Sequence, residues 1–285
     1  MAMPSDRTEF LRGSSLLGKA VLVVDLPSSL SLPLRLSIMT DRPLADKIAL
    51  VTGATRGIGA ATAVMLAAAG AHVVALGRTQ GALEELDDAI QAVGGSATLV
   101  PLDVTDFNAI DRLGAALYER YQRLDVFVGN AGVLGPITPL SHVDPKDFDQ
   151  ALSVNVTANY RFVRALDPLL RLSSAGRAVL VTSGAAYKAR AYWGPYAVTK
   201  AALDLIGRTW AAETATTALR VNMFNPGPVR TNMRAKAFPF EDPQTLPVPE
   251  DVARAILALC LPDLEATGKL YDFPSRALLD FQPPA

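Results

Sequence analysis

The chain is poor in the residues that form disulfides and bind metals. Cys260 is the only cysteine, so no disulfide forms within one chain, and a reducing compartment is consistent with this composition. His72 and His142 are the only histidines, which leaves no group of residues with the composition of a zinc site. We therefore expect a cytoplasmic protein without a bound metal.

Long apolar runs and an excess of one charge are also missing. No segment approaches the roughly 20 consecutive apolar residues that cross a bilayer, so we expect no membrane span. The formal net charge is −1, which argues against nucleic acid as the main partner. Half of the 285 residues are apolar and 19% are charged, values typical of a soluble globular enzyme with a large core.

The N-terminal segment differs from the rest of the chain, because serine and proline residues interrupt every periodic pattern in it. A secretory signal or a transit peptide is an alternative, weakened by acidic residues such as Glu9 and by the lack of a cleavage motif. We expect residues 1–40 to be a disordered extension, upstream of a natural start near Met39. Residues 41–285 are expected to form one domain.

From Lys47 onward, short apolar segments alternate with helical ones. The expected strands are 48–52, 72–76, 98–102, 124–128, 178–182, 219–224 and 269–273. The expected helices are 57–69, 80–93, 106–121, 145–172, 195–214 and 250–261, with Asp106 as the N-cap of the third. The strands are nearly continuous apolar runs, as in sheets covered on both faces. The alternation predicts a single doubly wound parallel sheet of the Rossmann-like α/β class.

A glycine-rich loop follows the first expected strand. Its pattern is G-x-x-x-G-x-G, from Gly53 to Gly59. Glycine allows a tight turn and a close approach of the backbone to a pyrophosphate, while the following helix presents free N–H groups. The loop is therefore a candidate dinucleotide site. Its candidate cofactor contacts are Gly53, Thr55, Arg56, Gly57, Ile58 and Gly59.

The end of the second strand bears on the choice of cofactor. An acidic residue there binds a ribose 2′-hydroxyl, whereas arginine suits a 2′-phosphate. This chain reads Leu76-Gly77-Arg78-Thr79, and Arg56 adds a second cation from the glycine loop. Two guanidinium groups match a dianionic phosphate. The sequence favours NADP(H), with NAD(H) left open.

Tyr196 and Lys200 are four residues apart, and Ser183 precedes the tyrosine. On a helix this spacing brings the ammonium to the same face as the phenol, where a cation lowers a tyrosine pKa. The spacing alone is weak, because about one in six chains of this composition would contain it by chance. With the glycine loop upstream, it indicates a tyrosine that works as an acid or base.

In this order, the motifs resemble the short-chain dehydrogenase/reductase family in its non-extended form, over about Leu44 to Tyr271. The resemblance implies that Asp103 and Val104 hold the adenine and that Thr231 lies near the pyrophosphate. A motif of the Asn-Ala-Gly type lies beside the cofactor, and a Pro-Gly stretch passes the nicotinamide amide. The implied contacts beyond the glycine loop are Asp103, Val104, Asn130, Ala131, Gly132, Tyr196, Lys200, Pro226, Gly227, Val229 and Thr231.

The resemblance also implies a catalytic tetrad of Asn155, Ser183, Tyr196 and Lys200. In this scheme Tyr196 exchanges the proton, Ser183 binds the carbonyl oxygen, Lys200 holds the nicotinamide ribose, and Asn155 positions a water that connects Lys200 to solvent. One position departs from the family pattern. Gly129 stands where many members have an asparagine before the Asn-Ala-Gly motif.

The resemblance implies a small carbonyl or alcohol substrate, covered by a mobile lid around residues 229–249. The stretch 232–243 is similar to a bacterial subgroup without an assigned substrate. A homodimer or homotetramer is expected, because the family pairs the helices that correspond to 145–172 and 195–214. One alternative is a cofactor-binding regulator or scaffold with little turnover. A Rossmann-type methyltransferase is another, disfavoured by the lack of an acidic residue after the second strand.

Overall fold

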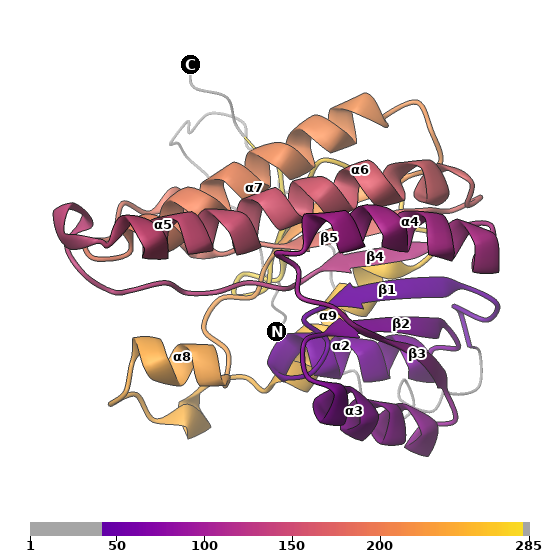
Figure 1. Ribbon diagram of the computed structural model, residues 1–285, viewed down its shortest axis with the longest axis horizontal. Coiled ribbons are helices and arrows are strands. Elements are labelled where there is room, and N and C mark those ends of the chain that lie inside the picture. The colour runs from indigo at the N-terminus through magenta and orange to yellow at the C-terminus, as the bar shows by residue number, and fades with distance from the viewer. Residues whose placement is uncertain (1–41, 282–285) are drawn as a thin grey trace, which may run out of the picture.

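The computed structural model describes residues 42–281, so the expected extension of residues 1–40 lies outside them. One sheet forms the centre of the described part, with the strand order β3-β2-β1-β4-β5-β6-β7-β8 (Figure 1). The strands are β1 (Ile48–Thr52), β2 (His72–Gly77), β3 (Ser96–Pro101), β4 (Val126–Gly129), β5 (Arg177–Val181), β6 (Arg220–Asn225), β7 (Leu270–Asp272) and β8 (Ala277–Leu279).

Every neighbouring pair from β3 to β7 is parallel, which confirms the predicted doubly wound sheet. The last strand is an exception. β8 pairs with β7 antiparallel after a tight turn in which Arg276 has a φ of 53°. The sequence reading missed β8 because three residues are too few to show a strand periodicity.

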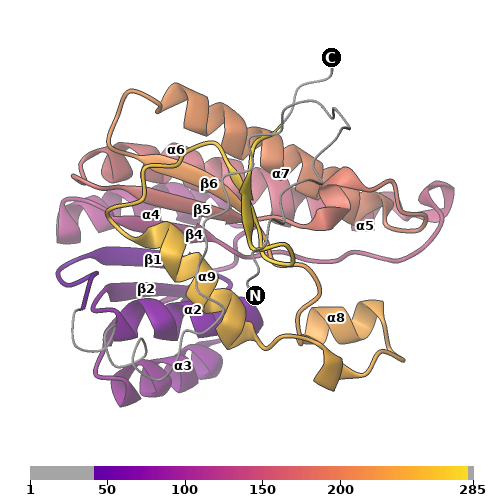
Figure 2. The same ribbon diagram turned by 180° about the vertical axis from the view of Figure 1, so that it is seen from behind.

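Helices cover both faces of the sheet (Figures 1 and 2). One layer contains α2 (Gly57–Ala68), α3 (Gln80–Ala92) and α9 (Pro249–Cys260). The other contains α4 (Phe107–Tyr121), α5 (Pro145–Leu152), α6 (Ala158–Arg171) and α7 (Gly194–Glu213). A short helix, α8 (Asn232–Ala237), stands apart from both layers.

Successive residues of a strand point to opposite faces, and this alternation divides the core into two. Val51 and Val128 pack under α2 and α9. Leu50 and Phe127 face the other way, toward α4 and α6. Strands with apolar residues on both faces therefore read as the continuous apolar runs that the sequence contains.

The expected helix 145–172 is two helices joined by a π turn, Ser153–Thr157. The N–H of Ala158 bonds to the Ser153 carbonyl, one residue further back than in an α-helix. Such turns concentrate at functional sites, and this one contains Asn155. The predicted N-cap at Asp106 is confirmed, since its carboxylate accepts from the Ala109 N–H at 2.9 Å.

The ring of Phe162 on α6 is 1% exposed and lies 5.7 Å, between centroids, from Phe127 on β4. We expect Phe162→Ala to lower the free energy of unfolding by about 3–5 kcal/mol, because the cavity cannot close fully. Urea denaturation measures the change. Tyr118→Ala on α4, where the ring is 50% exposed, is the control. Equal losses in the two variants would contradict the assignment of Phe162 to the core.

Candidate active site

The site residues gather at the carboxyl edge of the sheet, where β1 and β4 are neighbours and the chain order reverses. Ligands of open α/β sheets bind outside such a reversal. The glycine loop leaves β1, the Asn-Ala-Gly motif leaves β4, Ser183 follows β5, and the Pro-Gly stretch leaves β6. Segments far apart in sequence are therefore side by side.

The glycine loop has the shape that a phosphate cradle requires. Gly53 and Gly57 have φ angles of 62° and 54°, which favour glycine. A Cβ atom at Gly59 would lie 2.2 Å from the Gly53 carbonyl oxygen, so no side chain fits there. Within the described residues, no side chain caps α2 and its first turn has no acidic residue. The open N–H groups and the helix dipole fit a dinucleotide pyrophosphate.

Asn130 fixes this loop to the end of β4. Its Nδ2 donates to the carbonyl oxygens of Thr52 at 2.9 Å and Gly53 at 3.2 Å. The Thr52 hydroxyl accepts in turn from the N–H groups of Asn130 and Ala131, both at 3.0 Å. Asn130, predicted to lie beside the cofactor, therefore shapes the cradle. Thr52 was not predicted, although it ends a strand directly before the loop.

The two arginines expected at the 2′-phosphate are exposed and belong to adjoining segments. Thr55 packs over the end of β2, since a Cβ at Gly77 would lie 2.4 Å from its Cγ2. Arg78 follows directly, with its Nη1 3.9 Å from Oδ2 of Asp103. Both side chains of that pair are about half exposed or more, so it contributes little to stability. Hydrogen bonds from Thr105 hold the pKa of Asp103 below its usual range, with Arg78 a smaller cause.

Two other predicted cofactor residues have side chains that pack in the hydrophobic core. Ile58 packs against the cluster under α2, and Val104 is 7% exposed within the opposite cluster. Their side chains anchor the segments that carry the polar contacts.

The four predicted tetrad residues come together. Ser183 follows β5, while Tyr196 and Lys200 lie in the first turns of α7. Lys200 is 4% exposed and its Nζ donates to the Val181 carbonyl at 2.7 Å. A Cβ at Gly132 would lie 3.6 Å from that Nζ and 3.3 Å from Oδ1 of Asn155. The Asn-Ala-Gly motif therefore adjoins both residues.

The Asn155 side chain is fully buried and joins two elements. Its amide exchanges two hydrogen bonds with the backbone of Val133, at 2.8 and 2.9 Å. Its Nδ2 also donates to the Thr199 hydroxyl at 2.9 Å, which donates to the Tyr196 carbonyl at 2.8 Å. Asn155 therefore ties the loop after β4 to the helix that carries Tyr196.

Burial dominates the electrostatics of the pair on α7. It raises the pKa of Tyr196, and the Ser183 hydroxyl acts in the opposite direction. Burial lowers the pKa of Lys200 to about 8, which the negative charge of Asp204 opposes. The expectation that Lys200 lowers the Tyr196 pKa is not met in the protein by itself. The ammonium lies 5.7 Å from the phenol ring centre and is bonded to Val181.

Asp204 was missed in the sequence, although it follows Lys200 by one helical turn. It is 4% exposed and accepts a hydrogen bond from the Tyr187 hydroxyl. Burial raises its pKa, and Lys200 is among the groups that lower it. The i, i+4 spacing on a helix was the signal that could have found it.

The segment after β6 reaches both the catalytic loop and the glycine loop. Oδ1 of Asn225 accepts from the N–H groups of Gly184 at 2.8 Å and Gly227 at 3.1 Å. Thr231 caps α8 and lies against the glycine loop, since a Cβ at Gly57 would be 3.4 Å from its Cγ2. Pro226 and Val229, expected along the nicotinamide, lie between these two contacts in the chain.

Aromatic side chains connect the segment after α8 to Tyr196 on α7. The ring of Phe238 lies 5.7 Å from Trp193, which meets Tyr196 edge-on at 5.9 Å. The Arg234 guanidinium lies 3.7 Å from the Phe238 ring centre and forms two hydrogen bonds with Glu241. Trp193 therefore links the segment expected to form a lid to Tyr196.

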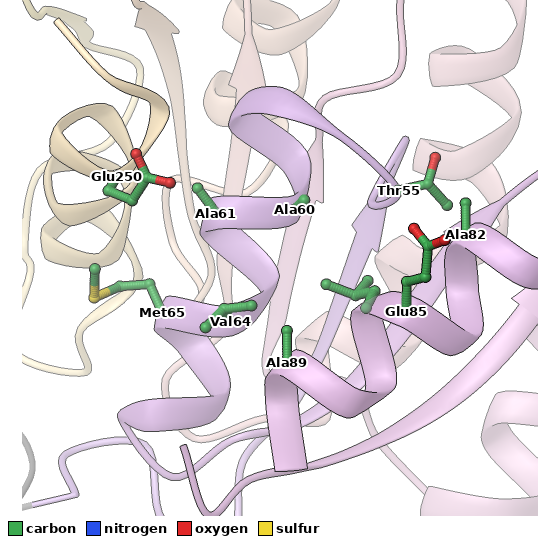
Figure 3. Close-up of a pocket in the computed structure, with 10 residues that line it drawn as sticks. Thr55, Ala60, Ala61, Val64, Met65, Ala82, Glu85, Ala89 and Glu250 are labelled. Atoms are coloured by element: carbon green, nitrogen blue, oxygen red, sulfur yellow. The ribbon is translucent and has the colours of Figure 1, made fainter. Parts of the chain in front are cut away.

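A separate groove is lined by residues of α2 and α3 and by Glu250 of α9, and no tetrad residue lines it (Figure 3). Small apolar side chains form most of it, with Glu85 and Glu250 at its sides. Carboxylates repel phosphate, so we do not assign this groove to the cofactor phosphates. None of the helices within residues 42–281 combines the length and apolarity that a bilayer crossing needs.

Comparison with known proteins agrees with this geometry. The sequence profile of the short chain dehydrogenase family matches residues 47–242. The chain belongs to the short-chain dehydrogenase/reductase family. The uncharacterized oxidoreductase YciK of Escherichia coli (strain K12) is 39% identical over 234 residues, which are 80% of this chain and 92% of that protein.

Solved structures of short chain dehydrogenases share the fold. One from Shigella flexneri, complexed with NADP, has 37% identity and a TM-score of 0.79, and the match covers 82% of this chain and 99% of that one. Another, from Escherichia coli and complexed with NADPH, has 38% identity and a TM-score of 0.77, with 81% and 98% covered. This chain is thus an oxidoreductase of the short-chain dehydrogenase/reductase type.

We expect Asp204→Asn to lower the pKa of Lys200 below its value of about 8, because the variant loses the negative charge that opposes burial. The ammonium form of Lys200 exists below its pKa, so the variant loses it at a lower pH than the unchanged enzyme. An NMR titration of the lysine side chains measures the shift. Asp88→Asn, at an exposed site on α3, is the control. An unchanged or raised Lys200 pKa in Asp204→Asn contradicts the coupling.

Proposed function

We propose that this enzyme is an NADP(H)-dependent oxidoreductase in which Tyr196 exchanges the proton with a carbonyl or alcohol substrate. The observation that carries the proposal is the position of Tyr196. Its phenol is buried, faces the Ser183 hydroxyl and shares a helix face with Lys200, at the sheet edge where the glycine loop ends. The bound nicotinamide supplies or accepts the hydride.

In the direction of reduction, Tyr196 is the proton donor. Burial keeps its pKa above the usual value, so the phenol holds its proton at neutral pH. The proton passes from the phenol oxygen to the substrate oxygen as the carbonyl carbon is reduced. Ser183 donates a hydrogen bond to the same oxygen and stabilises the charge that develops there. Oxidation runs the same proton transfer in reverse.

Lys200 and Asn155 restore the proton on Tyr196 in this proposal. Lys200 is positively charged below a pKa of about 8, so below that pH its ammonium holds a proton that replaces the one Tyr196 gives up. Its contact with the Val181 carbonyl holds the ammonium at the strand end. Asn155 orients the helix of Tyr196 through Thr199, and in this proposal a water at Asn155 connects Lys200 with solvent.

Arg56 and Arg78 favour NADP(H) over NAD(H). Both are exposed cations at the ends of β1 and β2, where a 2′-phosphate needs them. The complexes of related dehydrogenases with NADP and NADPH support this preference. The glycine loop would hold the pyrophosphate, with Thr231 beside it, and Asp103 would lie near the adenine.

The residues around Tyr196 support a partly apolar substrate. Trp193 and Phe238 form an aromatic wall beside it, and Phe238 belongs to the lid that we propose at 229–249.

Exposed apolar side chains on α6 and α7, such as Tyr160 and Leu205, support the proposed pairing of subunits through these helices.

We expect Tyr196→Phe to lower NADPH-dependent carbonyl reduction at least about 100-fold, because the phenol is the proton donor. A panel of carbonyls and alcohols, followed at the NADPH absorbance band, measures turnover, and fluorescence titration measures NADPH binding. Tyr118→Phe on α4 is the matched control. Near-native reduction by Tyr196→Phe would remove the proton-donor role. NADPH binding by the unchanged protein with no turnover on the panel would favour the regulator or scaffold.

We expect the double variant Arg56→Ala and Arg78→Ala to bind NADPH at least about tenfold more weakly and NADH with unchanged affinity, because charged hydrogen bonds to the 2′-phosphate are lost. Fluorescence titrations with both cofactors measure this. Arg112→Ala on α4, an arginine side chain 72% exposed, controls for the loss of a surface charge. Equal affinity of the unchanged enzyme for NADPH and NADH is the result that contradicts the paired-arginine argument.

A further inference from the structure

Gly129, which departs from the family pattern, has its side-chain space filled by another residue. It ends β4 and pairs with Leu180 on β5. A Cβ at this position would lie 2.8 Å from Oδ1 of Asn159 and 2.8 Å from Cδ2 of Leu180. Real Cβ atoms do not approach neighbours below 3.0 Å. Glycine is therefore what makes room for the Asn159 amide.

Asn159 reaches from this space to the π turn that contains Asn155. It lies in the first turn of α6 and is 3% exposed. Its Nδ2 donates to the main-chain carbonyl of Asn155 at 2.9 Å. A buried amide that bonds to the π turn, rather than to its own helix end or to solvent, gives this turn a support that the backbone alone does not provide.

Asn159 acts on Asn155 through the main-chain carbonyl of that residue and not through its side chain. The amide of Asn155 is committed to Val133 and Thr199. A carbonyl oxygen accepts two hydrogen bonds, and Asn159 supplies one of them. The Asn155 side chain lies beside Lys200, since a Cβ at Gly132 would be 3.3 Å from its Oδ1 and 3.6 Å from the Lys200 Nζ, and it reaches Tyr196 through Thr199.

We propose that Asn159 is a positioning residue for the reaction, and that Gly129 and Asn159 act as a pair: the Asn159 amide holds the π turn at Asn155 and so aligns Asn155 with Lys200 and Tyr196. This inference rests on the proposed function. Asn159 touches no reacting atom and acts through the Asn155 carbonyl. In this chain the amide on α6 takes up the space that many relatives fill from the strand.

The test compares Asn159→Leu and Asn159→Asp with the unchanged enzyme in NADPH-dependent carbonyl reduction. Leu is close in size and cannot donate, while Asp keeps the shape and, when ionised, also lacks a donor. We expect kcat to fall at least about fivefold, the KM for NADPH to stay within about twofold, and the alkaline limb of the kcat profile to shift in pH. Thermal melts establish that each variant is folded, and Asn159→Asp serves if Asn159→Leu is not.

Asn222→Leu is the matched control. Asn222 is a buried asparagine whose amide donates to the Ala266 carbonyl at 2.8 Å and accepts from the Lys269 N–H at 3.0 Å, far from the tetrad in the chain. It should lose stability as Asn159→Leu does while keeping its kcat and pH profile. If both leucine variants lose stability and neither changes the pH profile or kcat, Asn159 is structural only and the inference is overturned.

A double-mutant cycle tests the pairing of the two residues. Gly129→Ala alone should lower kcat, because its methyl group displaces the Asn159 amide. In an Asn159→Ala background, the same substitution should lower kcat much less. An equal effect in both backgrounds overturns the pairing. If the unchanged enzyme turns over and the variants keep its kcat and pH profile, this inference fails while the proposed function stands. Absence of turnover in the unchanged enzyme defeats the proposed function and this inference with it.

Discussion

Asn130 and Thr52 form the hydrogen bonds that join the end of β1 to the end of β4, and the site depends on this constraint. These bonds hold the glycine loop close to the start of α2, where Gly59 has no room for a side chain. The loop thereby presents the open N–H groups of α2 at the sheet edge. Because Gly132 follows in the loop after β4, the same contact places the glycine loop beside Lys200 and Asn155.

Burial gives the tetrad its chemical character. Removing Tyr196 and Lys200 from water raises the pKa of the phenol and lowers that of the ammonium, so each group becomes less charged. The Ser183 hydroxyl opposes the shift of the Tyr196 pKa, and the negative charge of Asp204 opposes the shift of the Lys200 pKa. The balance leaves a phenol that holds a proton and a lysine whose charge responds near neutral pH.

The aromatic wall beside Tyr196 includes Phe238, which ends the short helix α8 that stands apart from both helix layers. α8 and its following turn depend on few core contacts, and Phe238 meets Trp193 at the start of α7. An ion pair between Arg234 and Glu241 stiffens that turn from within. Trp193 therefore joins this segment to Tyr196 on α7 through two aromatic contacts.

The alternation of apolar strands and helices and the glycine loop could be predicted from the sequence, because local spacing dictates them, whereas the tetrad was predicted from the resemblance to a family. Helix periodicity places Lys200 on the face of Tyr196, and the positive φ at Gly53 favours glycine. Only the tertiary structure decided the π turn at Asn155, the β8 hairpin, the direction of the Tyr196 pKa shift and the meeting of Gly129 with Asn159. Burial and contacts between residues distant in sequence arise from packing, which no local pattern encodes.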